Sequence, residues 1–95
     1  MRYIWDVKKD RANAKKHAIR FEDAVGIWND FVFDRIEDSL DYEEERLLAI
    51  GLINGIEIVV VYTERREDRR IISARKADRR ERQDCWQARY EEERR

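Results

Sequence analysis

The sequence predicts an α+β domain in a single unit over residues 1–95: a short N-terminal strand, two helices, an antiparallel four-stranded sheet and a C-terminal helix. Apolar residues follow a helical period in some stretches, whereas β-branched runs, which are typical of strands, dominate others. An Asn-Gly pair separates two such runs, which indicates a β-hairpin. A chain of 95 residues can bury one core, and we expect the helices to pack on one side of the sheet.

The N-terminal third is expected to hold one strand and two helices. Tyr3-Ile4-Trp5 is aromatic and β-branched, as strands are. Asp6 can cap a helix that runs to about Lys16, because its carboxylate accepts hydrogen bonds from the free N–H groups of the first turn. A second short helix over 21–29 is predicted by an apolar stripe at i, i+3, i+4 and i+7: Phe21, Ala24, Val25 and Trp28.

The rest of the chain is expected to hold the sheet and the last helix. Four strands are predicted: one that begins at 31–33, and three that cover 46–53, 57–64 and 69–74. Asn54-Gly55 joins the second and third of these, because both central positions of a type I′ turn need positive φ. The acidic stretch 37–45 is predicted to be a loop. A helix follows over about 78–93, with Asp78 as its N-cap.

Charge is abundant but segregated along the chain. Charged residues make up 45% of the sequence, yet the net charge is only -1. Residues 1–20 and 65–82 each sum to +5, whereas 34–45 sum to -6. If the two basic segments meet in space, the molecule has one cationic face suited to nucleic acid. A solvated, salt-bridged surface is the alternative interpretation.

Several classes of protein are disfavoured by simple features. The single cysteine, Cys85, excludes a disulfide framework and a zinc cluster built on cysteine pairs. The longest apolar run, 58–62, is far shorter than the roughly 20 residues of a membrane span. The first residues lack the apolar segment of a secretion signal, so we expect a cytoplasmic protein.

The first candidate site lies where the last predicted strand passes into the last helix. Alternation along a strand puts Ile71, Ser73 and Arg75 on one side and Ile72, Ala74 and Lys76 on the other. At a frayed strand end, Arg75 and Lys76 could nevertheless reach one phosphate, with Arg79 and Arg80 adding contacts one turn later. Ordinary surface arginines at a strand end are the alternative.

Two further candidates involve proton transfer. Glu64 and Arg65 end the preceding strand near Arg70, so Glu64 could act as a general base, or could simply pair with Arg70 across the strands. His17 is the only histidine in the chain and closes the first helix beside Lys15 and Lys16. It could cap that helix or act as an acid or base.

Three stretches in order carry a family resemblance: Trp5-Asp6-x-x-Lys9 with Asn13 and Lys16-His17; Glu45-Arg46 leading to Val60-Val61-Tyr62-Thr63-Glu64-Arg65; and Arg70-Ile71-Ile72-Ser73-Ala74-Arg75-Lys76-Ala77. The chain resembles the BrnT family over about residues 3–82. The resemblance implies a RelE-like toxin of a type II toxin–antitoxin pair, an endoribonuclease that inhibits translation by cutting RNA. This chain differs from many relatives at Tyr62, where they carry histidine, and at Phe31, where they carry proline.

The resemblance also implies partners. A BrnA-like ribbon-helix-helix antitoxin would neutralise the toxin, and the complex would bind operator DNA only through the antitoxin. A homodimer within a toxin–antitoxin heterotetramer fits this arrangement, and no membrane is involved.

The resulting hypothesis is RNA cleavage by attack of the 2′-hydroxyl on the adjacent phosphorus, without metal or cofactor. We expect Arg65, Arg75 and Lys76 to stabilise the phosphate, and Tyr62 or Glu64 to transfer protons with His17 in reserve. The expected RNA contacts are Lys15, Lys16, Arg70, Arg79 and Arg80. The hypothesis requires Arg65 and Lys76 to share one anion-receiving pocket.

Two other functions compete with this one. A catalytically degenerate binding module could act as the antitoxin's partner and co-repressor without cutting RNA. A protein that binds DNA directly is disfavoured, because no helix-turn-helix pattern occurs and the basic residues flank a sheet.

Overall fold

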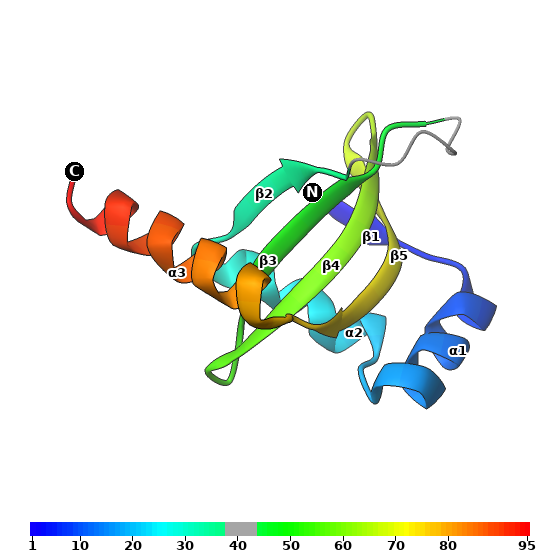
Figure 1. Cartoon of the computed structure of the whole chain (residues 1–95). Helices are drawn as coiled ribbons and strands as arrows, with labels where there is room; N and C mark the ends of the chain where they lie inside the picture. The colour runs from blue at the N-terminus through cyan, green and yellow to red at the C-terminus, as the bar shows by residue number, and fades with distance from the viewer. Residues whose placement is uncertain (38–43) are drawn as a thin grey trace.

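The computed structural model describes residues 1–37 and 44–95, and Figure 1 shows the arrangement of their elements. The elements in chain order are β1 (Arg2–Ile4), α1 (Val7–His17), α2 (Phe21–Ala24), the 3-10 helix η1 (Val25–Asn29), β2 (Phe33–Ile36), β3 (Leu47–Ile53), β4 (Ile56–Arg65), β5 (Asp68–Lys76) and α3 (Arg79–Glu93). The predicted helices and strands are confirmed, although β2 begins at Phe33 and the second helix continues as η1. The predicted acidic loop at 37–45 lies mostly outside the described residues.

Within the described residues, the sheet has five strands in the order β1-β5-β4-β3-β2. Neighbours from β2 to β5 pair antiparallel, as predicted, but β1 joins the sheet as a fifth strand parallel to β5. The prediction of a wholly antiparallel four-stranded sheet is therefore incomplete. Arg2 joins β1 to β5, because its guanidinium donates to both carboxylate oxygens of Asp68 at 3.0 and 2.7 Å.

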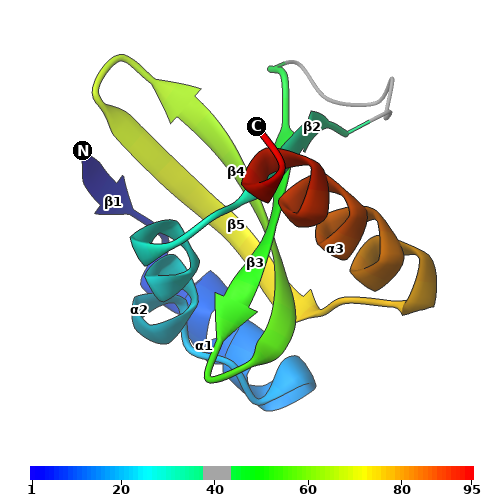
Figure 2. The same cartoon turned by 90° about the vertical axis from the view of Figure 1, so that its left-hand side faces the viewer.

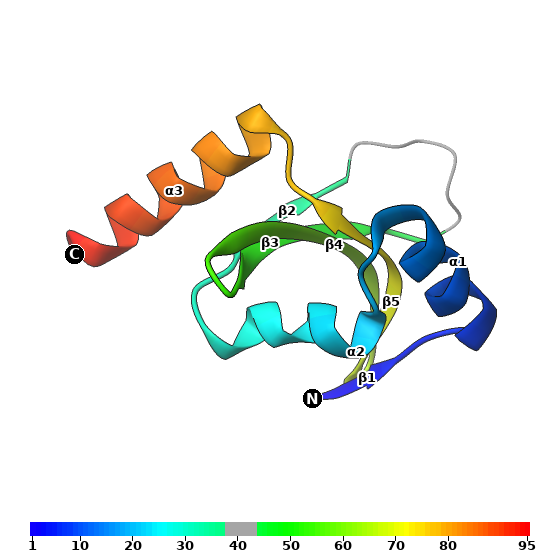
Figure 3. The same ribbon diagram turned by 90° about the horizontal axis from the view of Figure 1, so that it is seen from below.

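Helices cover both sides of the curved sheet, and the prediction that they pack on one side is wrong. Figures 2 and 3 show α2 and η1 on the concave side, here called the inner face, and α3 on the opposite, outer face. The physical reason is that the central strands are apolar on both faces. The inner core includes Phe21, Ile27, Ala49, Ile58 and Val60, and the outer core contains Leu48, Ile50, Val59, Ala77 and Cys85.

A β-bulge in β5 changes which residues share a face. Tyr62 is opposite Ile71 and Val61 is opposite Ser73, so Ile72 is an extra residue with no partner in that register. A bulge inserts one residue and thereby reverses the alternation beyond it.

The consequence is that Ile71 and Ala74 both lie in the inner core, although strict alternation would separate them. Beyond the bulge, Arg75 therefore points to the outer face and Lys76 to the inner face. The prediction that Ile71, Ser73 and Arg75 share one face is wrong for this reason.

Local signals set the ends of the elements. The carboxylate of Asp6 accepts hydrogen bonds from Lys8 N and Lys9 N at 2.7 and 3.4 Å, which caps α1 as predicted. Asn54 and Gly55 have φ values of 51° and 79°, so the predicted hairpin turn is confirmed. Asp78 caps α3 and forms a reciprocal capping box with Glu81.

Helix α1 continues the edge of the sheet where β1 ends. The side-chain amide of Asn13 donates to Ala74 O at 2.8 Å and to Ile19 O at 2.9 Å, and its oxygen accepts from Ala74 N at 3.1 Å. Asn13 thus satisfies backbone groups of β5 that an adjacent strand would otherwise bind. In Figure 3, α1 lies just beyond β5.

Candidate active site and nucleic-acid interface

The two basic segments of the chain lie side by side, because α1 packs along β5. Asn13 in the middle of α1 is hydrogen-bonded to Ala74 in β5. At one end, the hydrogen bond from Lys8 N is the main cause that lowers the pKa of Asp6, and Arg70 is close enough to add a small electrostatic contribution. At the other end, His17 and Lys76 line the same pocket. The charge pattern therefore does produce a common cationic region.

That region does not bring Arg65 and Lys76 together. In the β4–β5 pair, Arg65 is opposite Asp68 beside the turn, whereas Lys76 is opposite Ile58 at the far end. The seven residue-to-residue steps from Ile58 to Arg65 span about 23 Å of extended strand. The predicted single anion-receiving pocket containing Arg65 and Lys76 is wrong, because the hairpin places them at opposite ends.

The guanidinium of Arg75 is held by α3. Its Nη1 and Nη2 donate to the two carboxylate oxygens of Glu81 at 2.7 and 2.8 Å. These bonds, chiefly, lower the pKa of Glu81 to about 2, and they raise the pKa of Arg75. Arg35 of β2 also approaches Glu81, at 3.9 Å. Arg75 therefore joins the sheet to α3 in this structure, while the neighbouring Lys76 side chain points away from it.

Arg65 is similarly paired, at the opposite end of the sheet. Its Nη2 donates to Glu44 Oε1 at 2.8 Å, and this bond is the main cause that lowers the pKa of Glu44. Glu64 faces Arg69 across the strands at 3.9 Å. The predicted alternative pairing of Glu64 with Arg70 is therefore wrong, because the turn after Arg65 sets a register in which Arg70 is opposite Thr63.

Tyr62 belongs to the inner core. Only 2% of the residue is exposed, and its ring meets Trp28 edge-on at 5.1 Å between centroids. Its hydroxyl donates to Asp34 Oδ1 at 2.7 Å. Burial and this hydrogen bond raise the pKa of Tyr62 well above its ordinary value. Such a hydroxyl is poorly placed to exchange protons with a substrate at the surface.

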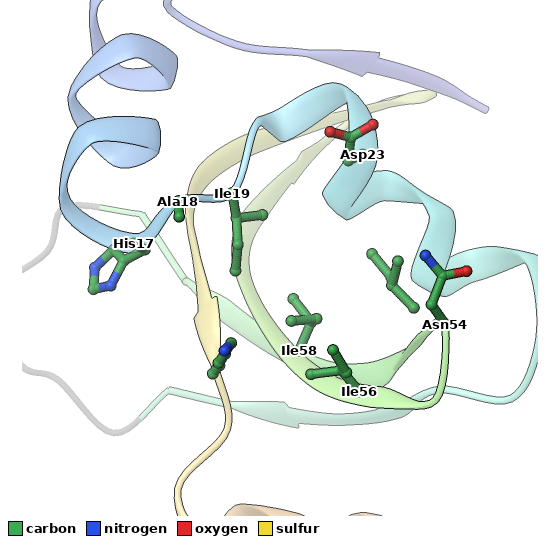
Figure 4. A pocket seen from close by; sticks show the side chains of 9 residues that line it. His17, Ala18, Ile19, Asp23, Asn54, Ile56 and Ile58 are labelled. Atoms are coloured by element: carbon green, nitrogen blue, oxygen red, sulfur yellow. The ribbon is translucent and has the colours of Figure 1, made fainter.

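His17 and Lys76 are the two predicted catalytic residues that the structure brings into one cavity, which we call the His17 pocket. Its volume is about 550 Å³. Figure 4 shows His17 at the end of α1 and Asn54 in the β3–β4 turn, with isoleucine side chains between them. The lining residues are His17, Ala18, Ile19, Asp23, Ile53, Asn54, Ile56, Ile58 and Lys76.

Three local features of the backbone shape this pocket. Helix α1 ends at His17 because Ala18 adopts the left-handed conformation, with φ 59°. The turn at Asn54 closes the far side, and the bulge in β5 sets Lys76 toward the inner face. Asp23 and Asn54 also line the pocket but were not predicted as site residues. The sequence pattern assigns Asp23 to the surface of a helix and Asn54 to a turn.

Charges around the His17 pocket are available to a ligand. Within residues 1–37 and 44–95, neither His17 nor Lys76 forms an ion pair. Lys16 precedes the pocket on α1, and Arg79 and Arg80 follow Lys76 as exposed residues of the first turn of α3. The lining also includes the carboxylate of Asp23, which opposes an anion. The imidazole, the ammonium group and the apolar walls are the groups that can hold a phosphate and a base and transfer a proton.

Other kinds of site find less support. Among the described residues, no group of three or more His, Cys, Asp and Glu side chains is arranged to hold a metal ion. No helix in the described part of the chain is long and apolar enough to cross a membrane.

Comparison with known proteins identifies a family. A family model described as a ribonuclease toxin, BrnT, of type II toxin–antitoxin systems matches residues 5–81. This range includes α1, the four strands from β2 to β5, and the pocket residues His17, Asp23 and Lys76. No curated protein matches the chain.

Proposed function

The chain belongs to the BrnT family of ribonuclease toxins of type II toxin–antitoxin systems, and from this premise we propose that it is an endoribonuclease that cuts RNA at the His17 pocket. The observation that supports this site is the meeting of His17 and Lys76, from distant parts of the sequence, at one apolar cavity. Arg65 and Arg75 are each bound to a carboxylate, whereas His17 and Lys76 form no ion pair with any described residue.

The proposed reaction is attack of a ribose 2′-hydroxyl on the adjacent phosphorus, without a metal ion. His17 accepts the hydroxyl proton, since histidine is the side-chain type whose charge changes nearest neutral pH. The new P–O2′ bond forms as the P–O5′ bond breaks, and the departing 5′-oxygen takes a proton from water at the pocket mouth. Lys76 stabilises the negative charge that accumulates on the phosphoryl oxygens.

The isoleucines of the pocket give the substrate its position. Ile19, Ile53, Ile56 and Ile58 form apolar walls against which a nucleobase can pack. Lys16, Arg79 and Arg80 attract the phosphates next to the cut, an interaction that is independent of sequence and weakened by salt. Arg65 and Arg70, at the far end of β4 and β5, would contact a more distant part of the RNA.

The cellular role that we propose follows the family. Cleavage of RNA in the cytoplasm inhibits translation, and a BrnA-like ribbon-helix-helix antitoxin neutralises the toxin by covering its cationic region. An acidic antitoxin segment is the expected complement. The toxin reaches operator DNA only through the antitoxin, in an assembly that can contain two toxin copies.

The test is cleavage of single-stranded RNA by the purified chain, with a chelator present, beside a growth assay on expression. We expect His17→Ala to lower the cleavage rate about 10²–10⁴-fold, the range typical of a general base. Lys76→Ala should also lower it, whereas Lys8→Ala, which removes an exposed charge on α1, should not. The growth defect should follow the cleavage rates.

Two results would contradict the proposal in different ways. If His17→Ala and Lys76→Ala cleave as fast as the unmodified protein, the His17 pocket is not the active site. If the unmodified protein leaves RNA intact but binds its antitoxin tightly, the chain is the degenerate binding module instead.

A further inference from the structure

The rotation of α1 about its axis is set by Asn13. Its side chain faces β5, to which it is joined by the two hydrogen bonds with Ala74. Successive helical residues are about 100° apart, so Lys9 and Lys16 lie within about 60° of Asn13 on one flank. Asp10 and His17 lie on its other flank. Lys8 and Arg11, like Lys15, fall on the opposite side of the helix and point away from β5.

The two flanks of α1 face different sides of the sheet. Asp10 turns toward the inner face, where its carboxylate accepts from Phe21 N at 2.9 Å and from Arg20 Nη2 at 2.9 Å. The opposite flank, with Lys9 and Lys16, therefore borders the outer face. Both lysines are exposed, and neither forms an ion pair with the residues that the structure describes.

Strand β5 adds a third cation to the same border. Arg69 points to the inner face, since its guanidinium lies 4.6 Å from the centre of the Trp28 ring. The adjacent Arg70 therefore points to the outer face, near the start of α1. Its place there agrees with its electrostatic interaction with Asp6, the residue that caps the helix.

The acidic residues of α1 and its cap do not cancel this charge at the surface. Asp6 accepts hydrogen bonds from the backbone of Lys8 and Lys9, and Asp10 is 3% exposed and paired with Arg20. Both carboxylates are thus engaged within the fold. The border between α1 and β5 presents ammonium and guanidinium groups to solvent.

We propose that Lys9, Lys16 and Arg70 form a phosphate-binding strip on the outer side of the α1–β5 border, which guides single-stranded RNA to the C-terminal end of α1, where the strand passes to the inner side and the His17 pocket. This inference rests on the proposed cleavage at that pocket. Lys9 and Lys16 are separated by about 10 Å along the helix, which matches about three phosphates of a stacked strand. The strand must be unpaired, because a base can enter the pocket only when it is free of its partner.

The test measures binding separately from cleavage. A fluorescent decanucleotide with 2′-O-methyl groups lacks the attacking hydroxyl, so its affinity can be followed by anisotropy at several salt concentrations. The double variant Lys9→Ala/Lys16→Ala should bind about tenfold more weakly at low salt, and its salt slope should fall by about 1.4, or about 0.7 for each phosphate contact. Lys8→Ala/Arg11→Ala removes the same charge from the opposite side and should bind like the unmodified chain.

Each possible result decides the matter. Equal losses in the two double variants would show only a general charge effect and would overturn the strip, as would no loss in either. Tighter binding of a 2′-O-methyl duplex than of the single strand would overturn the choice of substrate. A wild-type protein that binds the oligonucleotide as expected but cuts no unmodified RNA would refute the proposed function and leave the strip standing.

Discussion

Replacing Glu81 by glutamine tests how α3 is held against the sheet. The Glu81 carboxylate accepts two hydrogen bonds from Arg75 and one from Asp78 N at 2.8 Å, and the residue is 5% exposed. Glutamine keeps the shape and can still accept the bond from Asp78, so the capping box is retained. The substitution removes the charge that faces Arg75 and replaces the acceptor of Arg75 Nη2 by an amide nitrogen.

The expected magnitude follows from the pKa of Glu81. Arg75, as the main cause, lowers it from 4.5 to about 2. At about 1.4 kcal/mol for each pKa unit, this shift corresponds to at most about 3 kcal/mol of folding free energy. The Arg75 side chain is 35% exposed, so solvent screens the pair, and we expect about 2 kcal/mol.

The same pKa shift also sets the direction in which the contribution of Glu81 to the free energy of unfolding changes with pH. The pKa of Glu81 is lower in the folded than in the unfolded chain, so its contribution is complete above about pH 4.5 and is lost toward pH 2. Urea unfolding followed by tryptophan fluorescence should give a difference between wild type and Glu81→Gln of about 2 kcal/mol at pH 7. The difference should shrink to about 1 kcal/mol at pH 3.5.

A matched control separates this ion pair from a general effect of charge on α3. Glu93 pairs with Arg89 one turn earlier, but its side chain is 66% exposed. Glu93→Gln should change the free energy of unfolding by no more than about 0.5 kcal/mol. The reasoning is refuted if Glu81→Gln lowers the free energy of unfolding at pH 7 no more than Glu93→Gln does. It is also refuted if the decrease caused by Glu81→Gln is the same at pH 7 and at pH 3.5.

Two further predictions concern packing. Asn13→Asp should lower the free energy of unfolding by about 2–4 kcal/mol at pH 7 in the same urea assay, because a carboxylate would face the Ala74 carbonyl with no proton to donate. A decrease of less than about 1 kcal/mol would contradict the role of Asn13 at the sheet edge. Gly51→Ala should lower the free energy of unfolding by about 1–3 kcal/mol, because its new Cβ would lie 2.7 Å from Ile27 Cβ. The control is Gly26→Ala, whose new Cβ would have its nearest neighbour, Ile53 Cδ1, at 4.0 Å and should leave thermal unfolding nearly unchanged.

Features that depend on neighbouring residues were predictable from the sequence. The cap at Asp6, the positive φ values at Asn54 and Gly55, and the start of α3 after Asp78 each depend on a few adjacent groups. The physical causes of these features lie within one turn of chain, so no tertiary information was needed. Segregation of charge offered a cationic face only on the condition that the basic segments meet, and the packing of α1 along β5 decided that condition.

The site depended on tertiary structure, because side-chain direction and partner choice are set by the whole sheet. One bulged residue, Ile72, exchanged the faces on which Arg75 and Lys76 lie, and pairing in register placed Arg65 far from both. Glu81, at the start of the next helix, then engaged Arg75, and Glu44, from before β3, engaged Arg65, while burial enclosed Tyr62. Sequence alone determined which residues can carry charge and chemistry; only the packed chain decided which of them remain unpaired beside a cavity, because that competition is between groups far apart along the chain.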